Sequence, residues 1–528
     1  RASEVGVRVL EQGGSAFDAS IAASFMQMVT DPFMCGVGGM GTAQVYVAAT
    51  GKCHTIDFHG RAGSLVNPGM WASDIQGRTP VSGYTLFDDY RSEIGYTSIM
   101  TPGTVAGYGE IHRRFATLPW RQLLAPAIAA CRDGIRAPTY LVDFLRRPLQ
   151  TGVPNGHRRI STTVDCAKLY LDSNGDVIQE GALLRNPDMA SVLETLACLG
   201  PRSFYEGSLG EMIAEDLANN GSYVTRQDLS GYSIRSGTPI TVAYRDCTVS
   251  SNLPPGGGPW LLEALNILEG FTLSDMEHNG PEFLHVLASA MELAHSDRDS
   301  YLGDPDFVNV PLKTIFLSKD HALKLRECIK GNQRTPDYKG KSIPSETTHL
   351  SVVDGEGNIV TVTHTLGTSS GVITKGLGFM YNNSMKLADP IAHRPNSIAP
   401  GKARITGMCP TIVFKGNSPI LIAGAPGGNV IMSAVLQTII NVIDFNMTAT
   451  EAVSAPRIHA EGGMVYVEHR IREDTCEMLI RMGHRVDHLM QSYAADFSRP
   501  QIVKILNDGS LDGGSDPRGG GGLAYSRS

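Results

Sequence analysis

The sequence predicts a mixed α/β protein whose helices and strands form layers, and three observations carry this prediction. Apolar residues recur at helical spacing along much of the first two thirds of the chain. Short runs rich in β-branched residues lie between these helical segments. Of the 528 residues, 42% are hydrophobic and 19% are charged, which is typical of a chain with a globular core. Helices and strands that alternate in this way favour a layered α/β domain.

Helices are expected where apolar residues repeat every three or four positions. Residues 281–301 give the clearest case, because one apolar stripe runs along the segment. The expected helices are 16–29, 121–131, 208–218, 260–269, 281–301 and 430–445. The expected strands are 43–48, 54–58, 240–244, 411–414 and 420–423.

The composition excludes several classes of protein. The 45 Lys and Arg and 53 Asp and Glu give a net charge of −8 with no basic stripe, so we expect no nucleic-acid partner. No apolar run reaches the ~18 residues of a membrane span. The nine cysteines are scattered and the histidines form no ligand-like motif, so we expect no disulfide framework, metal ion or cofactor. The chain shows no leader segment, which favours a cytoplasmic over a periplasmic or secreted location.

A polar stretch, residues 332–346, interrupts the periodic pattern. It contains two prolines and no apolar repeat, so we expect an exposed, mobile segment. Two alternating β-branched runs follow, 349–353 and 358–366, joined by a polar loop at 354–358. This pattern predicts a β-hairpin. The polar segment therefore leads directly into a strand that starts near Thr347.

The hairpin loop fixes which residues face each other. With the loop centred on Glu356, Thr347 faces Thr365 and His349 faces Thr363. Directly opposed residues place their Cβ atoms ~5 Å apart. The hydroxyl of Thr347 is therefore expected beside a second hydroxyl on the neighbouring strand.

Such a threonine can act as a nucleophile. When a threonine is the first residue of a chain, its α-amine, with a pKa of about 8, can accept the hydroxyl proton near neutral pH. Cleavage between Glu346 and Thr347 would create such a terminus. The alternative is that Thr347 is an ordinary strand-edge threonine, a position that β-branched residues favour.

A glycine turn at residues 425–428 lies between an expected strand and an expected helix. The amides of Gly427 and Gly428 would lie at the positive end of the helix dipole, which suits an oxyanion. The alternative is an ordinary helix start with Asn429 as N-cap.

Two further motifs match known sequence patterns, but the secondary structure expected around them does not fit those patterns. Residues 36–41 read GVGGMG, yet a strand rather than a helix is expected after them, so a nucleotide site is not favoured. Residues 367–371 read GTSSG, which would make Ser369 a hydrolase nucleophile. The β-branched run that follows disfavours the helix such an elbow requires.

Several motifs together resemble one family. The stretch TTHLSVVD at 347–354 resembles the start of the small subunit of the γ-glutamyltranspeptidases, which use an N-terminal threonine nucleophile. The other matching motifs, in the family's order, are GGSAFDA (13–19), GVGGMG (36–41), TPGTVAG (101–107), DR with YLGDP (297–305), APGG (425–428) and DPR (516–518).

This resemblance implies an αββα four-layer sandwich formed by both halves of a self-cleaved precursor. Residues 1–346 would be the large subunit and 347–528 the small subunit, paired as a heterodimer or as a dimer of heterodimers. The hydroxyl of Thr347 would attack the carbonyl of Glu346. Thr365 resembles the family's second threonine, and Gly427 and Gly428 resemble its oxyanion donors.

The positions that hold glutamate in the family depart from its pattern. His59 stands where the family has an arginine, with Arg61 two residues on, and Gly367 stands where it has an asparagine. Leu387 replaces an aspartate that would bind the substrate ammonium, and Thr406 and Gly407 replace two serines. An ammonium facing Leu387 would lose its water without gaining a partner.

These departures bear on the expected substrate. Residues 394–402 resemble the transpeptidase-like acylases and amidohydrolases, cephalosporin acylases included. We therefore expect an amidohydrolase or acyltransferase whose acyl group is not glutamyl. Arg61 is the candidate for binding a substrate carboxylate, and the alternative is a surface or structural arginine. Two alternatives are a true γ-glutamyltransferase or glutathione hydrolase, and a non-catalytic binding relative.

Overall fold

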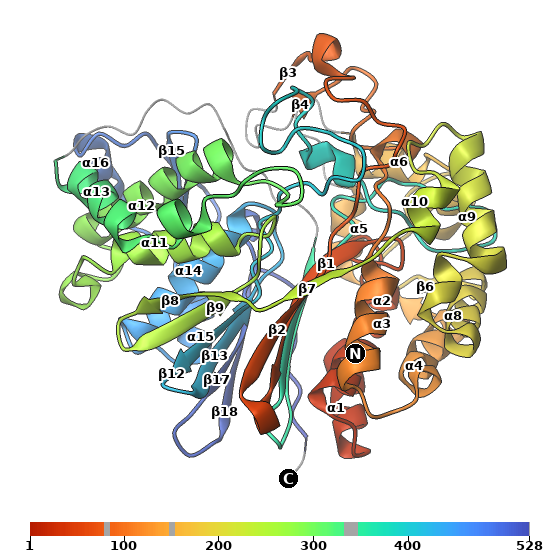
Figure 1. The fold of residues 1–528 in the computed structure, drawn as a ribbon, viewed down its shortest axis with the longest axis horizontal. Helices are drawn as coiled ribbons and strands as arrows, with labels where there is room; N and C mark the ends of the chain where they lie inside the picture. The colour runs from red at the N-terminus through yellow and green to blue at the C-terminus, as the bar shows by residue number, and fades with distance from the viewer. Residues whose placement is uncertain (79–84, 147–153, 332–346, 527–528) are drawn as a thin grey trace.

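Two β-sheets pack face to face between two layers of helices (Figure 1). The computed structural model describes residues 1–78, 85–146, 154–331 and 347–526. The predicted polar segment 332–346, with Glu346, lies outside the described residues.

The first sheet contains the predicted hairpin at its edge. Its strands are entirely antiparallel and run in the order β10, β11, β1, β2, β7. Their bounds are β10 Thr348–Val353, β11 Ile359–Thr365, β1 Met40–Val47, β2 Lys52–Phe58 and β7 Arg235–Gly237.

The second sheet carries the glycine turn. Its strands, also antiparallel, run in the order β18, β17, β13, β12, β9, β8. Their bounds are β18 Leu511–Ser515, β17 Gln501–Ile505, β13 Ser418–Gly424, β12 Thr411–Lys415, β9 Cys247–Ser251 and β8 Ile240–Tyr244.

A layer of helices buries the outer face of each sheet. On the first sheet, the core includes side chains of α1 Ala2–Glu11, α2 Ala16–Thr30, α3 Thr104–Phe115, α4 Trp120–Asp133, α8 Pro187–Leu199 and α9 Gly207–Asn219. On the second sheet, it includes side chains of α11 Gly258–Leu268, α12 Pro281–Tyr301, α13 Lys319–Lys330, α14 Val430–Ile443, α15 Ala449–Ser454 and α16 Glu473–Arg481. The αββα arrangement that the resemblance implied is therefore confirmed.

The remaining elements are short. The helices are α5 Thr139–Arg146, α6 Gly156–Ile160, α7 Val164–Tyr170 and α10 Arg226–Ser230. The strands are β3 Gly77–Arg78, β4 Thr85–Leu86, β5 Ile135–Arg136, β6 Leu183–Leu184, β14 Ile458–Glu461, β15 Met464–Val467 and β16 Val486–His488.

Local sequence explains why the central elements form where they do. Ser15 and Asp18 make a capping box that starts α2. Asp354 closes the hairpin loop, because its Oδ1 accepts from the backbone N–H of Glu356 and of Asn358. These contacts fix the end of β10 against α2, since the other oxygen of Asp354 accepts from the Ala16 amide.

Both sheets combine strands from before and after residue 346. In the first sheet, β11 pairs with β1 from Met40↔Thr365 to Tyr46↔Ile359. In the second, β12 pairs with β9 from Thr411↔Ser251 to Lys415↔Cys247. The two segments proposed as subunits are therefore interleaved in each layer.

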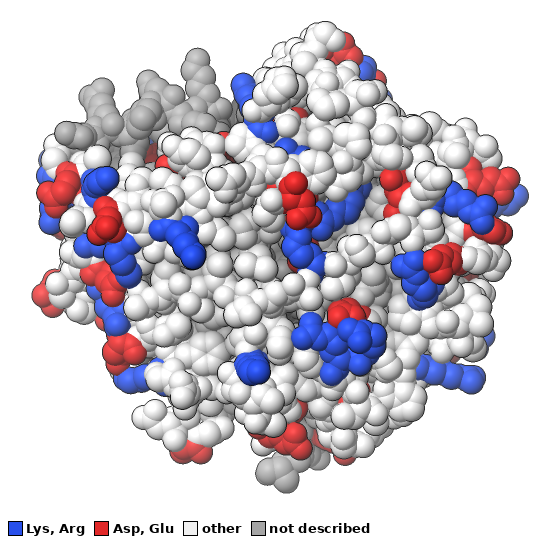
Figure 2. Space-filling view, viewed as in Figure 1, with Lys and Arg blue, Asp and Glu red and all other residues white. Residues whose placement is uncertain are grey.

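The predicted helices and strands listed from the sequence are all present, with ends that differ by a few residues. The structure also has strands that were not listed from the sequence, among them β18 in the glycine-rich tail. All nine cysteines are free. Among the described residues, no helix combines the length and apolar character needed to cross a bilayer. Acidic and basic side chains are interspersed on the face shown in Figure 2.

Candidate active site

The hydroxyls of Thr347 and Thr365 lie side by side. Thr347 Oγ1 donates to Thr365 Oγ1 at 3.1 Å, and both residues are buried. Thr365 Oγ1 also accepts from the amide of Gly367 at 2.8 Å. The hairpin register predicted from the sequence is confirmed, since His349 pairs with Thr363 and Ser351 with Thr361.

A row of polar side chains continues from Thr347 along the hairpin. The His349 ring contacts Thr363 Oγ1 at 2.8 Å and Ser351 Oγ at 3.0 Å. Burial, and then the neighbouring His364, lower the pKa of His349 to about 3. His349 is therefore neutral near pH 7 and holds its place through hydrogen bonds to hydroxyls.

The same ring brings the second sheet close to Thr347. A Cβ on Gly424, the last residue of β13, would lie 2.1 Å from His349 Cε1. Only a glycine leaves room for the imidazole there. The contact holds the end of β13, and the turn that follows it, near the start of β10.

The turn after β13 presents two free amides. Gly427 and Gly428 have φ values of +139° and +68°, which side chains other than glycine rarely adopt. Within the described part of the chain, neither N–H donates a hydrogen bond. Both amides precede α14, so the helix dipole favours negative charge beside them.

Asn429 is the N-cap residue of α14, as the alternative interpretation of this turn expected. Its side chain makes no capping hydrogen bond. Instead, its Oδ1 accepts from Arg298 Nη2 at 2.9 Å and its Nδ2 donates to Glu461 Oε1 at 3.1 Å. Asn429 therefore ties the glycine turn to α12 and β14.

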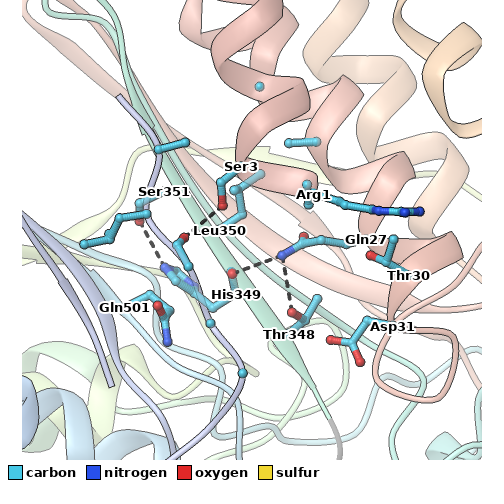
Figure 3. A pocket seen from close by; sticks show the side chains of 18 of the residues that line it. Arg1, Ser3, Gln27, Thr30, Asp31, Thr348, His349, Leu350, Ser351 and Gln501 are labelled. Atoms are coloured by element: carbon cyan, nitrogen blue, oxygen red, sulfur yellow. Dashed lines mark hydrogen bonds between the residues drawn. The ribbon is translucent and has the colours of Figure 1, made fainter. Parts of the chain in front are cut away.

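A cavity of about 470 Å³ runs along β10 and has Thr347 and Pro426 among its lining residues. Figure 3 shows Gln27 reaching from α2 to this strand, where its Nε2 donates to Thr348 Oγ1 and to the His349 carbonyl, each at 3.3 Å. The cavity thus gives space beside the Thr347 end of the strand. None of the five predicted substrate-contacting residues is among its lining residues.

His59 and Thr406, two of those five residues, contact each other. His59 Nε2 lies 3.3 Å from Thr406 Oγ1, and its Nδ1 pairs with Asp57. Burial alone would raise the pKa of Asp57, but His59 and Arg61 outweigh it and hold that pKa below its usual value. Asp57 is therefore ionised and orients the His59 ring.

Gly407 and Gly367 lie against the glycine turn and Thr365, respectively. A Cβ on Gly407 would lie 2.1 Å from the Gly428 carbonyl oxygen. A Cβ on Gly367 would lie 2.2 Å from Asn383 Oδ1, which accepts from the Thr368 amide at 2.9 Å. Both glycines allow a close approach of backbone or side chain that a larger residue would block.

Arg61 is engaged by an aspartate. Its Nη1 donates to Asp304 Oδ2 at 2.7 Å, and its side chain is 16% exposed. Asp304 also accepts from Arg235 at 2.8 Å and from the Ala403 amide at 2.8 Å. The guanidinium thus carries one carboxylate partner already and has some solvent contact.

The position of Leu387 offers no carboxylate of its own. The preceding residue, Lys386, is buried, and its Nζ lies 2.9 Å from Glu93 Oε1. Glu93 also pairs with Arg159 at 3.3 Å. The Glu93 carboxylate, which contacts the residue next to Leu387, is therefore neutralised by Lys386 and Arg159.

The two letter-match motifs do not form the sites that their patterns suggest. After Ser369 no helix begins before the short turn Ser384–Leu387, and Ser369 is fully buried. Residues 36–41 lead into strand β1. There a Cβ on Gly39 would lie 2.6 Å from the Thr365 carbonyl oxygen, so this glycine permits close packing behind Thr365.

Three contributors to the site were not found from the sequence. They are Gln27, which holds β10, Gly424, which accommodates His349, and Asp304, which binds Arg61. A glutamine within the apolar run 16–29 was a usable signal for Gln27, because a polar side chain on a buried helix face needs a partner.

Comparison with known proteins identifies one family over nearly the whole chain. The family model described as gamma-glutamyltranspeptidase matches residues 2–526. The chain belongs to the gamma-glutamyltranspeptidase family. Members of this family are hydrolases of amide bonds, so the chain is an enzyme of that class.

Relatives within the gamma-glutamyltranspeptidase family carry two kinds of name. The chain is 32% identical over 541 residues to the glutathione hydrolase proenzyme of Escherichia coli K12, covering 98% of this chain and 89% of that protein. It is 32% identical over 492 residues to the acylase ACY 1 proenzyme of Pseudomonas sp. strain V22, covering 92% of this chain and 85% of that protein. The crystal structure of cephalosporin acylase from Bacillus halodurans matches with a TM-score of 0.85 and 27% identity, covering 98% and 92%.

Proposed function

We propose that this protein is a self-processed amidohydrolase or acyltransferase in which Thr347 is the nucleophile. The observation that carries the proposal is the Thr347–Thr365 hydroxyl pair at 3.1 Å, at the first residue after the proposed junction. Processing would separate residues 1–346 from residues 347–528. The relatives named proenzymes support a precursor, and the interleaved sheets would keep the two products together.

Self-cleavage would begin with attack of Thr347 Oγ1 on the carbonyl carbon of Glu346. The peptide bond breaks as the ester forms, and the nitrogen of Thr347 takes up a proton to become a free amine. Water then hydrolyses the ester, which leaves a carboxylate on Glu346 and restores the hydroxyl. Thr365 is a positioning residue in this step, because it holds Thr347 Oγ1 by a hydrogen bond.

The mature enzyme would use the new amine as its base. Thr347 Oγ1 attacks the substrate amide, and its proton passes to the α-amine. The amides of Gly427 and Gly428 donate to the developing oxyanion. The C–N bond breaks as the amine returns the proton to the leaving group. Water, or an acceptor amine, then releases the acyl group from Thr347.

For the substrate, we propose an acyl group without an α-ammonium. Leu387 supplies no charge, and Glu93 nearby is already paired with Lys386 and Arg159. The 27% identity to a cephalosporin acylase across the whole chain favours the same assignment. Arg61 would bind a carboxylate at the far end of the acyl group, with His59, Thr406, Gly367 and Gly407 lining the site.

The second candidate is a glutathione hydrolase or γ-glutamyltransferase. Its support is the 32% identity to the E. coli glutathione hydrolase proenzyme over nearly the whole chain. This function needs an acidic group for the substrate ammonium, and a paired Glu93 could serve only if Lys386 moved away from it.

Processing can be tested on a denaturing gel. Purified protein should give two fragments, and N-terminal sequencing of the smaller should start at Thr347. Thr347→Ala should remain one chain, whereas Thr348→Ala should be cut, since Thr348 is bound to Gln27 rather than to Thr365. An intact, fully active wild-type chain would refute the proposal.

A further inference from the structure

A cluster of three ionisable side chains lies in the helical layer on the second sheet. Glu263 comes from α11, Asp297 from α12 and His321 from α13. Their ligand atoms all lie within 4.8 Å of one another. None of the three takes part in the proposed reaction.

The buried carboxylate of Glu263 has no hydrogen-bond donor among the described residues. The residue is 1% exposed. Its ionisable neighbours are the carboxylate of Asp297 and the imidazole of His321, whose Nε2 lies 3.6 Å from Glu263 Oε1. Two carboxylates this close require a shared proton or a cation.

The third residue completes a set of ligands. His321 Nε2 lies 2.7 Å from Asp297 Oδ2, and both side chains keep some solvent contact, 20% and 16%. Ligands about 2.1 Å from one tetrahedral ion lie roughly 3.4 Å apart. The distances from His321 Nε2, 2.7 Å to Asp297 and 3.6 Å to Glu263, lie on either side of this value. The solvent contact of His321 and Asp297 leaves a route by which an ion could reach the cluster.

We propose that Glu263, Asp297 and His321 bind a divalent transition-metal ion such as Zn²⁺. Two carboxylates balance the charge of the ion, and the imidazole favours a transition metal over Ca²⁺ or Mg²⁺. Such an ion would join α11, α12 and α13. The ion would therefore hold α13, which ends at Lys330 and is the last helix before residue 346.

Linear motifs could not reveal this site, which is why the sequence predicted no metal ion. Its ligands come from three separate helices and show no motif spacing. A second cluster, formed by His295, His459 and Glu461, is a weaker candidate. It holds one carboxylate instead of two, and the Arg298 cation acts on both His295 and Glu461.

The test is calorimetric titration of chelator-treated protein with Zn²⁺. One ion per chain should bind, with release of about one proton, measured by comparing buffers of different ionisation enthalpy. Glu263→Gln and His321→Asn should each weaken binding at least tenfold. Glu282→Gln, which removes an exposed carboxylate from α12, should bind as wild type does.

Folding of the variants can be checked without metal. Glu263→Gln removes a buried carboxyl that lacks a donor, so metal-free Glu263→Gln should melt no lower than metal-free wild type. Zn²⁺ should raise the melting temperature of wild type and of Glu282→Gln, and should fail to do so for His321→Asn. Unchanged binding in Glu263→Gln and His321→Asn, or loss of binding only in His459→Asn, would overturn the proposal. So would the absence of a one-to-one complex in wild type.

Discussion

The imidazole of His349 occupies the space that a side chain on Gly424 would need. This contact joins the two sheets beside the proposed nucleophile, because His349 follows Thr347 by two residues and Gly424 precedes Gly427 by three. The close packing of this ring against Gly424 thus positions the proposed nucleophile relative to the proposed oxyanion turn.

Gly424→Ala should destabilise the protein and slow self-cleavage. The new Cβ would lie 2.1 Å from the His349 ring, which hydrogen bonds to Thr363 and Ser351 hold in place. Overpacking of this kind costs about 1–3 kcal/mol. Urea unfolding in the single-chain Thr347→Ala background measures the stability, and a gel time course measures cleavage.

Gly355→Ala is the matched control for this substitution. Gly355 has open space around its Cβ position, so its variant should behave as wild type. Pairing Gly424→Ala with His349→Ala should show a coupling energy, because the second change removes the clash. Wild-type stability and cleavage in Gly424→Ala would show that the ring does not fix the turn.

Thr365→Val should preserve the fold but lower turnover on the order of 10²-fold, because Thr347 Oγ1 loses its hydrogen-bonding partner. Valine keeps the shape and strand propensity of threonine. Steady-state kinetics on a cleaved amide give the turnover number. Thr55→Val is the control, since Thr55 Oγ1 on β2 is buried without a hydrogen-bond partner among the described residues. Equal turnover in Thr365→Val and Thr55→Val would remove Thr365 from the mechanism.

Glutaryl anilide should be a better substrate than γ-glutamyl anilide, which differs from it only by the α-amino group. An ammonium at the Leu387 position would be buried without a partner, and such mismatches can reduce the specificity constant by up to ~10⁴. Butyryl anilide, which lacks the carboxylate, reports on Arg61. A clear preference for the glutamyl compound would favour the glutathione hydrolase assignment instead.

Stability should fall as the pH drops below about 6.5. Burial lowers the pKa of His364 to about 3, and burial with His364 does the same for His349. Between pH 3 and ~6.5 the unfolded chain binds protons that the folded chain does not. The free energy of unfolding therefore decreases as the pH is lowered through this range.

At pH 5, each of these histidines should lower the free energy of unfolding by about 2 kcal/mol relative to pH 7.5, given a pKa of ~6.5 in the unfolded chain. The free energy of unfolding of Thr347→Ala, measured with urea at both pH values, should therefore drop less once His364→Gln is added. The exposed His157→Gln is the control and should not alter the drop. The same drop in both variants would mean that His364 titrates normally in the fold.

The hairpin was predictable because its information is local. A period of two residues and a five-residue loop determine which residues face each other, so the Thr347–Thr365 contact followed from the sequence. The pairs Arg61–Asp304 and Lys386–Glu93 did not, since each joins residues hundreds of positions apart. Strand β18 was missed because glycine is disfavoured in strands, yet its backbone pairs with β17 from Gln501↔Ser515 to Ile505↔Leu511.

The interleaved sheets constrain the order of folding, cleavage and dissociation. Neither sheet is complete without strands from both sides of residue 346, so we expect folding to precede the proposed cut. Once cut, the two polypeptides could part only by opening the β1–β11 and β9–β12 ladders together. Reassembly would then be bimolecular and would lack the covalent link that first brought the strands into register. The mature enzyme should therefore owe its persistence to a slow rate of unfolding, and heat inactivation should be irreversible, whereas uncut Thr347→Ala should refold.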